Sequence, residues 1–287
     1  MQAKIRSSLG VTRCGGKEFR WGERTYVMGI LNITPDSFSG DGLGYNVDKA
    51  VAQAWRFVEE GADILDIGGE STRPGHIPVP AEEELRRVIP VIERLAGRIP
   101  VPMSIDTYKS EVAERALDAG AAVINDVWGL KRDPRLAELA AKRGVPLIVM
   151  HNQEGTNYAD LVPEVLASLR QSLSLAVERG VTWQNLIVDP GIGFGKTPEQ
   201  NLEIMNRLDE FASLHRPLLL GTSRKSMIGY ILNLPPQQRV EGTAATVALG
   251  IAKGVDMIRV HDVGSMVRVC RMSDAIVRGW RPEADLS

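Results

Sequence analysis

Several features are scarce in this chain of 287 residues, and each absence narrows the range of functions. The two cysteines, Cys14 and Cys270, lie far apart with no Cys-x-x-Cys pair, which argues against a disulfide framework and against a structural zinc site. No uncharged apolar run approaches the roughly 18 residues that a membrane span requires. The start, MQAKIRSSLG, carries charge with no hydrophobic segment behind it. We therefore expect a cytoplasmic protein without a membrane partner.

An excess of either charge is also missing, because 34 Lys and Arg residues are balanced by 36 Asp and Glu residues, a net charge of −2. This balance argues against a general nucleic-acid binder, which needs a basic surface. Aromatic residues make up only 5% of the chain, whereas 44% is hydrophobic. The core must therefore consist mainly of Val, Ile, Leu, Ala and Met, which is typical of buried parallel strands and their covering helices.

Short apolar, β-branched runs alternate along the chain with amphipathic stretches of helical spacing. The eight runs are 26–33, 63–67, 101–105, 122–125, 145–150, 186–188, 217–220 and 257–260. Helical spacing occupies 47–60, 81–96, 110–119, 134–143, 163–179, 242–253 and 265–277. Glycines 61, 120, 144, 180 and 254 stand where helices end before the next strand. Eight units of about 36 residues predict an α/β fold of the (β/α)₈ TIM-barrel type. A doubly wound sheet is the alternative, but no GxGxxG motif follows the first run.

We predict a single barrel domain over residues 1–287, because no linker, low-complexity tract or charge block divides the chain. The segment VTRCGGKEFRW, within about residues 10–22, has two short pieces around Gly15 and Gly16. This pattern is typical of a β-hairpin, which we expect to cap the bottom of the barrel.

Polar residues follow all eight apolar runs, where TIM barrels carry their active sites. A single Asp or Asn there can simply cap the next helix, but capping is a poor explanation for the whole set. Asp106, Asn125 and Asp189 would converge inside the mouth of the barrel. Carboxylates and an amide suit a flat heterocycle that presents several N–H donors, such as an aminopyrimidine.

Basic and hydroxyl residues follow the last two runs, at Ser223, Arg224, Lys225, Arg259 and His261. Barrels commonly bind phosphate at this position, so the sequence predicts an anion site opposite the heterocycle pocket. In the alternative interpretation, Lys225 and Arg259 only neutralise the carboxylates in a structural network.

Two other motifs are incomplete. The run GIGFGKT at 191–197 ends like a Walker A loop, but Pro190 stands where its first glycine is required. The four histidines are scattered without HExxH spacing, which argues against catalytic zinc. A hard cation held by Asn32 and by the phosphate oxygens of a ligand stays open.

Seven blocks of this sequence resemble the dihydropteroate synthases. They are GILNITPDSFSGDG (29–42), DIGGESTRPG (66–75), SIDTYK (104–109), INDV (124–127), DPGIGFGKT (189–197), SRKSMIG (223–229) and RVHDV (259–263). The blocks span nearly the whole chain, and NxTPDSFS and SRKS are specific to this family among pterin-binding barrels. The resemblance implies a homodimeric folate-pathway transferase that uses Mg²⁺. It would condense 6-hydroxymethyl-7,8-dihydropterin diphosphate with 4-aminobenzoate into 7,8-dihydropteroate and diphosphate, and sulfonamides would compete with 4-aminobenzoate.

The same resemblance implies a role for individual residues. Pterin contacts fall on Asp106, Asn125, Asp189 and Lys225, and diphosphate contacts on Thr72, Arg259, His261 and the backbone of Val260. Aminobenzoate would lie near Thr72, Arg73, Pro74, Phe194, Ser223 and Arg224. Asn32 would be associated with magnesium, and Asp36, Phe38 and Arg73 would belong to loops that close over the reaction.

The chain departs from the family pattern in three places. The first loop reads SFSGDGLG where SFSDGG is commoner, so Gly40 resembles an insertion. Trp128 and the run Met150–His151–Asn152 also differ. Two alternative functions follow: a pterin-binding paralogue without catalysis, and a pterin-dependent methyltransferase, which shares the pocket but needs no diphosphate site.

Overall fold

The computed structural model describes residues 9–34, 46–70 and 78–280. Eight strands form one sheet in the order β8-β7-β6-β5-β4-β3-β10-β9, and all their pairings are parallel. The strands are β3 (Tyr26–Asn32), β4 (Ile64–Gly68), β5 (Met103–Asp106), β6 (Val123–Asp126), β7 (Leu147–Met150), β8 (Leu186–Asp189), β9 (Leu219–Leu220) and β10 (Met257–Val260). A single bridge between Val188 and Leu218 brings the two ends of the sheet together. The predicted (β/α)₈ barrel is confirmed.

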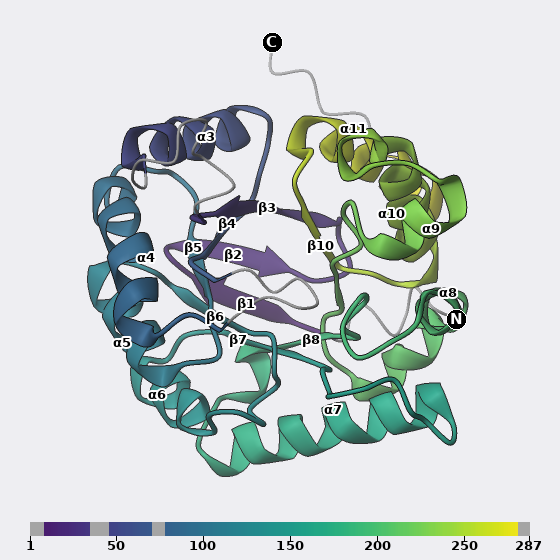
Figure 1. The fold of residues 1–287 in the computed structure, drawn as a ribbon, viewed down its shortest axis with the longest axis horizontal. Helices are drawn as coiled ribbons and strands as arrows, with labels where there is room; N and C mark the ends of the chain where they lie inside the picture. Colours follow the sequence, from purple (N-terminus) through teal and green to yellow (C-terminus); the bar gives the residue numbers. More distant parts are fainter. Residues whose placement is uncertain (1–8, 35–45, 71–77, 281–287) are drawn as a thin grey trace.

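Helices surround this ring of strands (Figure 1). They are α3 (Val47–Glu59), α4 (Ala81–Leu95), α5 (Ser110–Ala119), α6 (Arg135–Arg143), α7 (Leu161–Glu178), α8 (Pro198–Asn206), α9 (Ser226–Leu232), α10 (Val240–Lys253) and α11 (Val263–Asp274). Short turns lie at η1 (Trp183–Asn185), η2 (Leu208–Leu214), η3 (Pro236–Gln238) and η4 (Ala275–Gly279). None of the helices in the described part of the chain combines the length and the apolarity that crossing a bilayer requires.

Alternate residues of each strand face two different cores, because successive side chains of a strand point to opposite sides. Outward residues such as Leu65, Ile124 and Val188 pack with the apolar faces of the helices in one large cluster. Inward residues near the start of the strands form a second cluster at the lower end of the barrel. This alternation brings the remaining inward positions to the opposite end, where the strands finish.

The predicted hairpin is present and closes the lower end of the barrel. Strands β1 (Val11–Cys14) and β2 (Lys17–Arg20) pair antiparallel and lie across the middle of the ring in Figure 1. Phe19 and Trp21 pack against Tyr26, with ring centroids 4.9 Å and 5.4 Å from it. The indole Nε1 of Trp21 donates to Thr12 Oγ1 at 2.9 Å. The hairpin thus caps the barrel with an aromatic cluster that joins the inward residues of the strands.

Candidate functional site

The inward side of four strands changes from apolar to polar over two residues. The pairs are Ile64 and Asp66, Val123 and Asn125, Ile187 and Asp189, and Met257 and Arg259. Because residues two apart share a face of a strand, the second member of each pair lies directly above the first. The carboxyl ends of the strands therefore hold a layer of polar side chains on an apolar floor.

Arg259 joins the carboxylates of this layer to one another. Its Nε donates to Asp66 Oδ2 at 2.5 Å, and its Nη2 donates to Asp106 Oδ2 at 2.6 Å. Asn125 Nδ2 donates to the same Asp66 oxygen at 3.0 Å. The prediction that Arg259 lies opposite the carboxylates is wrong, because its long side chain reaches from β10 to Asp66 of β4 and Asp106 of β5. Within the described residues, Asp66 Oδ1 and Asp106 Oδ1 are buried without a hydrogen-bond partner, which leaves acceptors for the N–H groups of a ligand.

Burial dominates the electrostatics of this layer. It raises the pKa of Asp106 above the usual range, and the adjacent Arg259 charge only partly opposes this. Burial also raises the pKa of Asp189 to about 6, against hydrogen bonding from the backbone N–H of Gly191. For Arg259 burial acts against the charge, but Asp66 and Asp106 outweigh it and raise the pKa of the guanidinium. The layer thus has carboxyl groups that titrate close to neutral pH beside a cation that does not.

Lys225 and Phe194 form a second part of the mouth, beside Asp189. The Lys225 Nζ atom lies 4.1 Å from the centre of the half-buried Phe194 ring. Burial lowers the pKa of Lys225 to about 8, together with the charge of Arg259. Asp189 accepts the N–H of Gly191 at 2.7 Å, which ties the loop that carries Phe194 to the end of β8. Aromatic, cationic and acidic groups therefore meet here.

Two of the residues predicted for an anion, Ser223 and His261, lie together after β9 and β10. Ser223 Oγ accepts the backbone N–H of His261 at 3.1 Å and lies 3.0 Å from its Nδ1. Burial and the charge of Arg259 lower the pKa of His261 to about 3, so its imidazole is neutral. Val260 faces the outer core, which leaves its backbone at the strand end.

Arg224 forms an ion pair of its own, apart from the contact between Ser223 and His261. Its Nε donates to Asp262 Oδ2 at 3.0 Å, and a second bond joins Nη2 to Oδ1. The Arg224 backbone has a φ of +57°, which is uncommon for a residue other than glycine. Residues with strained backbones are concentrated at functional sites. The strained residue here, Arg224, stands between two predicted site residues, Ser223 and Lys225.

Asn32 ends β3 and is half-buried beside Gly68 of β4. Among the residues that the structure describes, no three His, Cys, Asp or Glu side chains gather as a ready-made metal site. Magnesium typically takes one or two protein oxygens and completes its shell with substrate phosphates and water. The amide oxygen of Asn32 fits such a shared site.

Five predicted site residues lie outside the described residues. They are Asp36 and Phe38 after β3, and Thr72, Arg73 and Pro74 after β4.

Two positions in the mouth received no role from the sequence. Asp66 binds both Arg259 and Asn125, and its place two residues after the inward Ile64 was an available signal. Lys196, within the incomplete Walker-like run, is buried against the loop after β8. A buried lysine at that position had no signal in the sequence.

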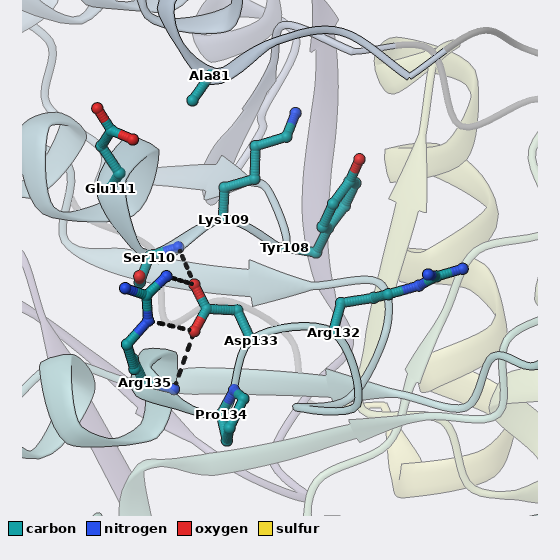
Figure 2. Close-up of a pocket in the computed structure, with 9 residues that line it drawn as sticks. All are labelled: Ala81, Tyr108, Lys109, Ser110, Glu111, Arg132, Asp133, Pro134 and Arg135. Carbon is teal, nitrogen blue, oxygen red and sulfur yellow. Dashed lines mark hydrogen bonds and ion pairs between the residues drawn. The ribbon is translucent and has the colours of Figure 1, made fainter.

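A separate hollow of about 570 Å³ lies on the rim between the starts of α5 and α6 (Figure 2). None of the predicted site residues lines it. Its basic side chains already have acidic partners: Lys109 contacts Glu70 and Glu84, Arg132 contacts Glu154, and Arg135 contacts Asp133. The polar layer in the barrel mouth is therefore the better candidate site.

Comparison with known proteins agrees with this geometry. The model of the pterin binding enzyme family matches residues 28–261. A dihydropteroate synthase of Bacillus subtilis is 54% identical over 255 residues, which cover 89% of this chain and 90% of that protein.

Solved structures give the same result. A dihydropteroate synthase of Clostridium difficile, solved with pteroic acid, is 51% identical and has a TM-score of 0.87, covering 89% of this chain and 97% of that one. The Xanthomonas albilineans enzyme with 4-aminobenzoic acid is 43% identical with a TM-score of 0.88, covering 93% of this chain and 97% of that one. The chain belongs to the pterin binding enzyme family and, within it, to the dihydropteroate synthases.

Proposed function

We propose that this chain is a transferase that joins 6-hydroxymethyl-7,8-dihydropterin diphosphate to 4-aminobenzoate, giving 7,8-dihydropteroate and diphosphate. The polar inner layer carries the proposal. Asp66, Asp106 and Asp189 offer acceptors for the N–H edge of a pterin, and Asn125 lies among them. Arg259 in β10 and His261 just after it would bind the leaving diphosphate, beside the carboxylates that Arg259 already contacts. One mouth thus fits both halves of the first substrate.

The chemistry follows from these charges. The bond between the pterin methylene carbon and the diphosphate oxygen breaks, and the electron pair leaves with the diphosphate. Arg259 stabilises the departing negative charge, and the carboxylates stabilise the positive charge that spreads into the pterin ring. The neutral amine of 4-aminobenzoate then attacks the methylene carbon and loses a proton to water. Its orientation matters more than a strong base, because the carbon is already electron-poor.

Magnesium is part of the proposal, with Asn32 as its protein ligand. The ion would neutralise the diphosphate of the substrate and so assist its departure. Thr72 would bind the same diphosphate, while Arg73, Pro74, Phe194, Ser223 and Arg224 would surround the aminobenzoate. Asp36, Phe38 and Arg73 would exclude water that could trap the pterin cation. Sulfonamides, which imitate 4-aminobenzoate, would compete for its place.

The test is diphosphate release from the pterin diphosphate with Mg²⁺, measured with and without 4-aminobenzoate, while product is followed by mass. Release that depends on 4-aminobenzoate and matches dihydropteroate formation supports the transferase. Binding of the pterin diphosphate without product under any condition points to the paralogue. Binding of the pterin that is indifferent to its diphosphate favours the methyltransferase.

A homodimer in the cytoplasm completes the proposal. In the predicted helix at 265–277, Met266 is buried in the core, whereas Met272 is 63% and Ile276 72% exposed. Tyr230 of α9 and Leu249 of α10 are 70% and 61% exposed, and these helices lie together with α11 in Figure 1. Grouped apolar side chains of this kind are typical of a self-complementary interface.

A further inference from the structure

Lys196 is a buried ammonium group whose neighbours are not carboxylates. Its Nζ atom donates to the carbonyl oxygen of Gly191 at 2.9 Å and to that of Phe194 at 3.0 Å, and it lies 3.0 Å from His151 Nδ1. Among the described residues no Asp or Glu comes within ion-pair distance of it. Burial of this charge is costly and lowers the pKa of Lys196 to about 7, although the more distant charge of Asp189 acts in the opposite direction.

The hydrogen-bond inventory explains why the charge is tolerated there. An ammonium group has three donors and no acceptor, and Lys196 has three acceptors around it. A neutral amine would leave one of them unmatched. His151 accepts through Nδ1, so its proton resides on Nε2. Burial and the Lys196 charge lower the pKa of His151 to about 2, which keeps that ring neutral.

The same three bonds fix the path of the loop between β8 and α8. Gly191 has a φ of +72°, and a Cβ atom there would lie 1.9 Å from the carbonyl oxygen of His151. At the other end of the loop, Tyr158 Oη donates to the Gly195 carbonyl at 2.7 Å. The loop is therefore pressed against the connection after β7, with Lys196 bound to both its start and its centre.

Phe194 connects this loop to the mouth of the barrel. Its ring lies beneath the ammonium of Lys225, and a Cβ atom on the neighbouring Gly193 would be 3.0 Å from Lys225 Cδ. A shift of the loop would thus move an aromatic wall of the mouth, whereas Lys225 itself is carried by the segment after β9. The benzene ring of an aromatic amine packs on such a wall.

We propose that Lys196 is a positioning residue: by bonding to Gly191, Phe194 and His151, it holds the Phe194 ring where the aromatic amine substrate binds. The inference rests on the proposed transferase function and adds a residue to it. Asp106, Asn125 and Asp189 are carried by strands rather than by this loop, so the pterin should be affected much less.

The first test compares Lys196→Met with Lys142→Met, the same change on an exposed lysine of α6. For Lys196→Met we expect the KM for 4-aminobenzoate to rise about 10-fold, since small misplacements of a binding group are costly. The Kd for the pterin diphosphate, measured by calorimetry, should change less than about 3-fold. Lys142→Met should change neither. An unchanged KM, or an equal loss of both ligands, would overturn the proposal.

Two further variants separate positioning from general damage to the fold. His151→Asn keeps an acceptor near the place of Nδ1 and should stay close to the parent, whereas His151→Leu should resemble Lys196→Met. In a Phe194→Ala background, Lys196→Met should add less than about 2-fold to the KM, because its effect passes through the ring. Additive losses would mean that Lys196 acts by another route.

A spectroscopic measurement tests the role of Lys196 independently of whether the proposed function is correct. In ¹⁵N-histidine spectra of the parent, the signal absent in His151→Asn should show an unprotonated Nδ1 and a proton on Nε2 from about pH 5 up to about pH 7, the range in which Lys196 keeps its charge. That signal should lose this pattern in Lys196→Met. A chain without synthase activity but with this signature refutes the function and leaves the loop assignment standing. A titrating His151 in the parent overturns the assignment itself.

Discussion

At the residue scale, the properties of the site depend on how burial shifts the pKa of each charged group in the mouth. Arg259 is bonded to Asp66 and Asp106, whereas Lys225 has an aromatic ring and more distant carboxylates around it. The guanidinium therefore keeps its proton at any working pH, and the ammonium does not. The acidic and basic limits of substrate binding should come from different residues.

The first prediction is a bell-shaped pH dependence of pterin binding. Burial raises the pKa of Asp106 to about 7 and that of Asp189 to about 6, so as the pH falls through these values the carboxylates gain protons and lose their acceptor charge. Lys225, with a pKa lowered to about 8, becomes neutral above that pH. We expect the strongest binding between these limits, measured by calorimetry across pH. Lys225→Arg should remove the alkaline limb, because an arginine stays charged. An alkaline limb that survives in that variant contradicts the assignment.

The second prediction concerns His261. Its lowered pKa makes it a neutral hydrogen-bond donor, and Ser223 holds its ring. His261→Ala should weaken binding of the pterin diphosphate by about tenfold, as expected for one hydrogen bond to a charged group. Binding of 6-hydroxymethylpterin, which lacks the diphosphate, should be nearly unchanged. Equal losses for the two ligands would disprove separate subsites.

Residue identities in the mouth were largely predictable, but their pairing was not. Asp106, Asn125, Asp189 and Arg259 each lie at or next to the end of an apolar run, and a barrel brings such ends together. The ion pairs of Arg259 depend on the reach of its side chain across neighbouring strands, which spacing does not encode. The roles assigned to these residues stay predictions.

At the element scale, strands and long helices follow the sequence pattern closely. The run at 257–260 and the helix at 110–119 have the predicted bounds, and Gly120 and Gly254 end helices with positive φ as expected. The helices α8 and α9 were missed. Both are short, and α9 begins inside the polar SRKSMIG block, where catalytic residues obscure the apolar period.

The third prediction is that the hairpin stabilises the fold without touching the site. Trp21 is 3% exposed, stacks among Phe19 and Tyr26, and bonds to Thr12. Trp21→Ala should lower the free energy of unfolding by about 3 kcal/mol, through the cavity it leaves. Denaturant titration measures this. The Kd for the pterin diphosphate should stay within about twofold, and a large loss of affinity would show that the lower end of the barrel shapes the mouth.

At the scale of the whole molecule, the proposed dimer face gives the fourth prediction. Replacing Met272 by Asp places a charge among the exposed side chains of α9, α10 and α11. Burial of an unpaired charge is strongly unfavourable, so light scattering should give the mass of a monomer where the parent gives a dimer. Lys142→Asp, on the exposed face of α6, is the matched control. A parent that is already monomeric refutes the proposed partner.

The count of eight strands predicted that the barrel closes. It did not predict how few hydrogen bonds join the two ends of the sheet. Strand β9 has only two residues, and a single bridge links it towards β8. Sequence pattern locates apolar runs, whereas the number of ladder hydrogen bonds depends on how the chain enters each strand. That a single domain spans residues 1–287 remains a prediction.

The aromatic hairpin also affects the order in which substrates can bind and products can leave. Phe19, Trp21 and Tyr26 fill the lower end of the barrel. Substrates and products would therefore enter and leave through the opposite end, where the strands finish. In the proposed function the pterin would bind next to the closed lower end, so it would enter before 4-aminobenzoate and leave after it. An excess of 4-aminobenzoate should then obstruct the entry of the pterin and slow turnover.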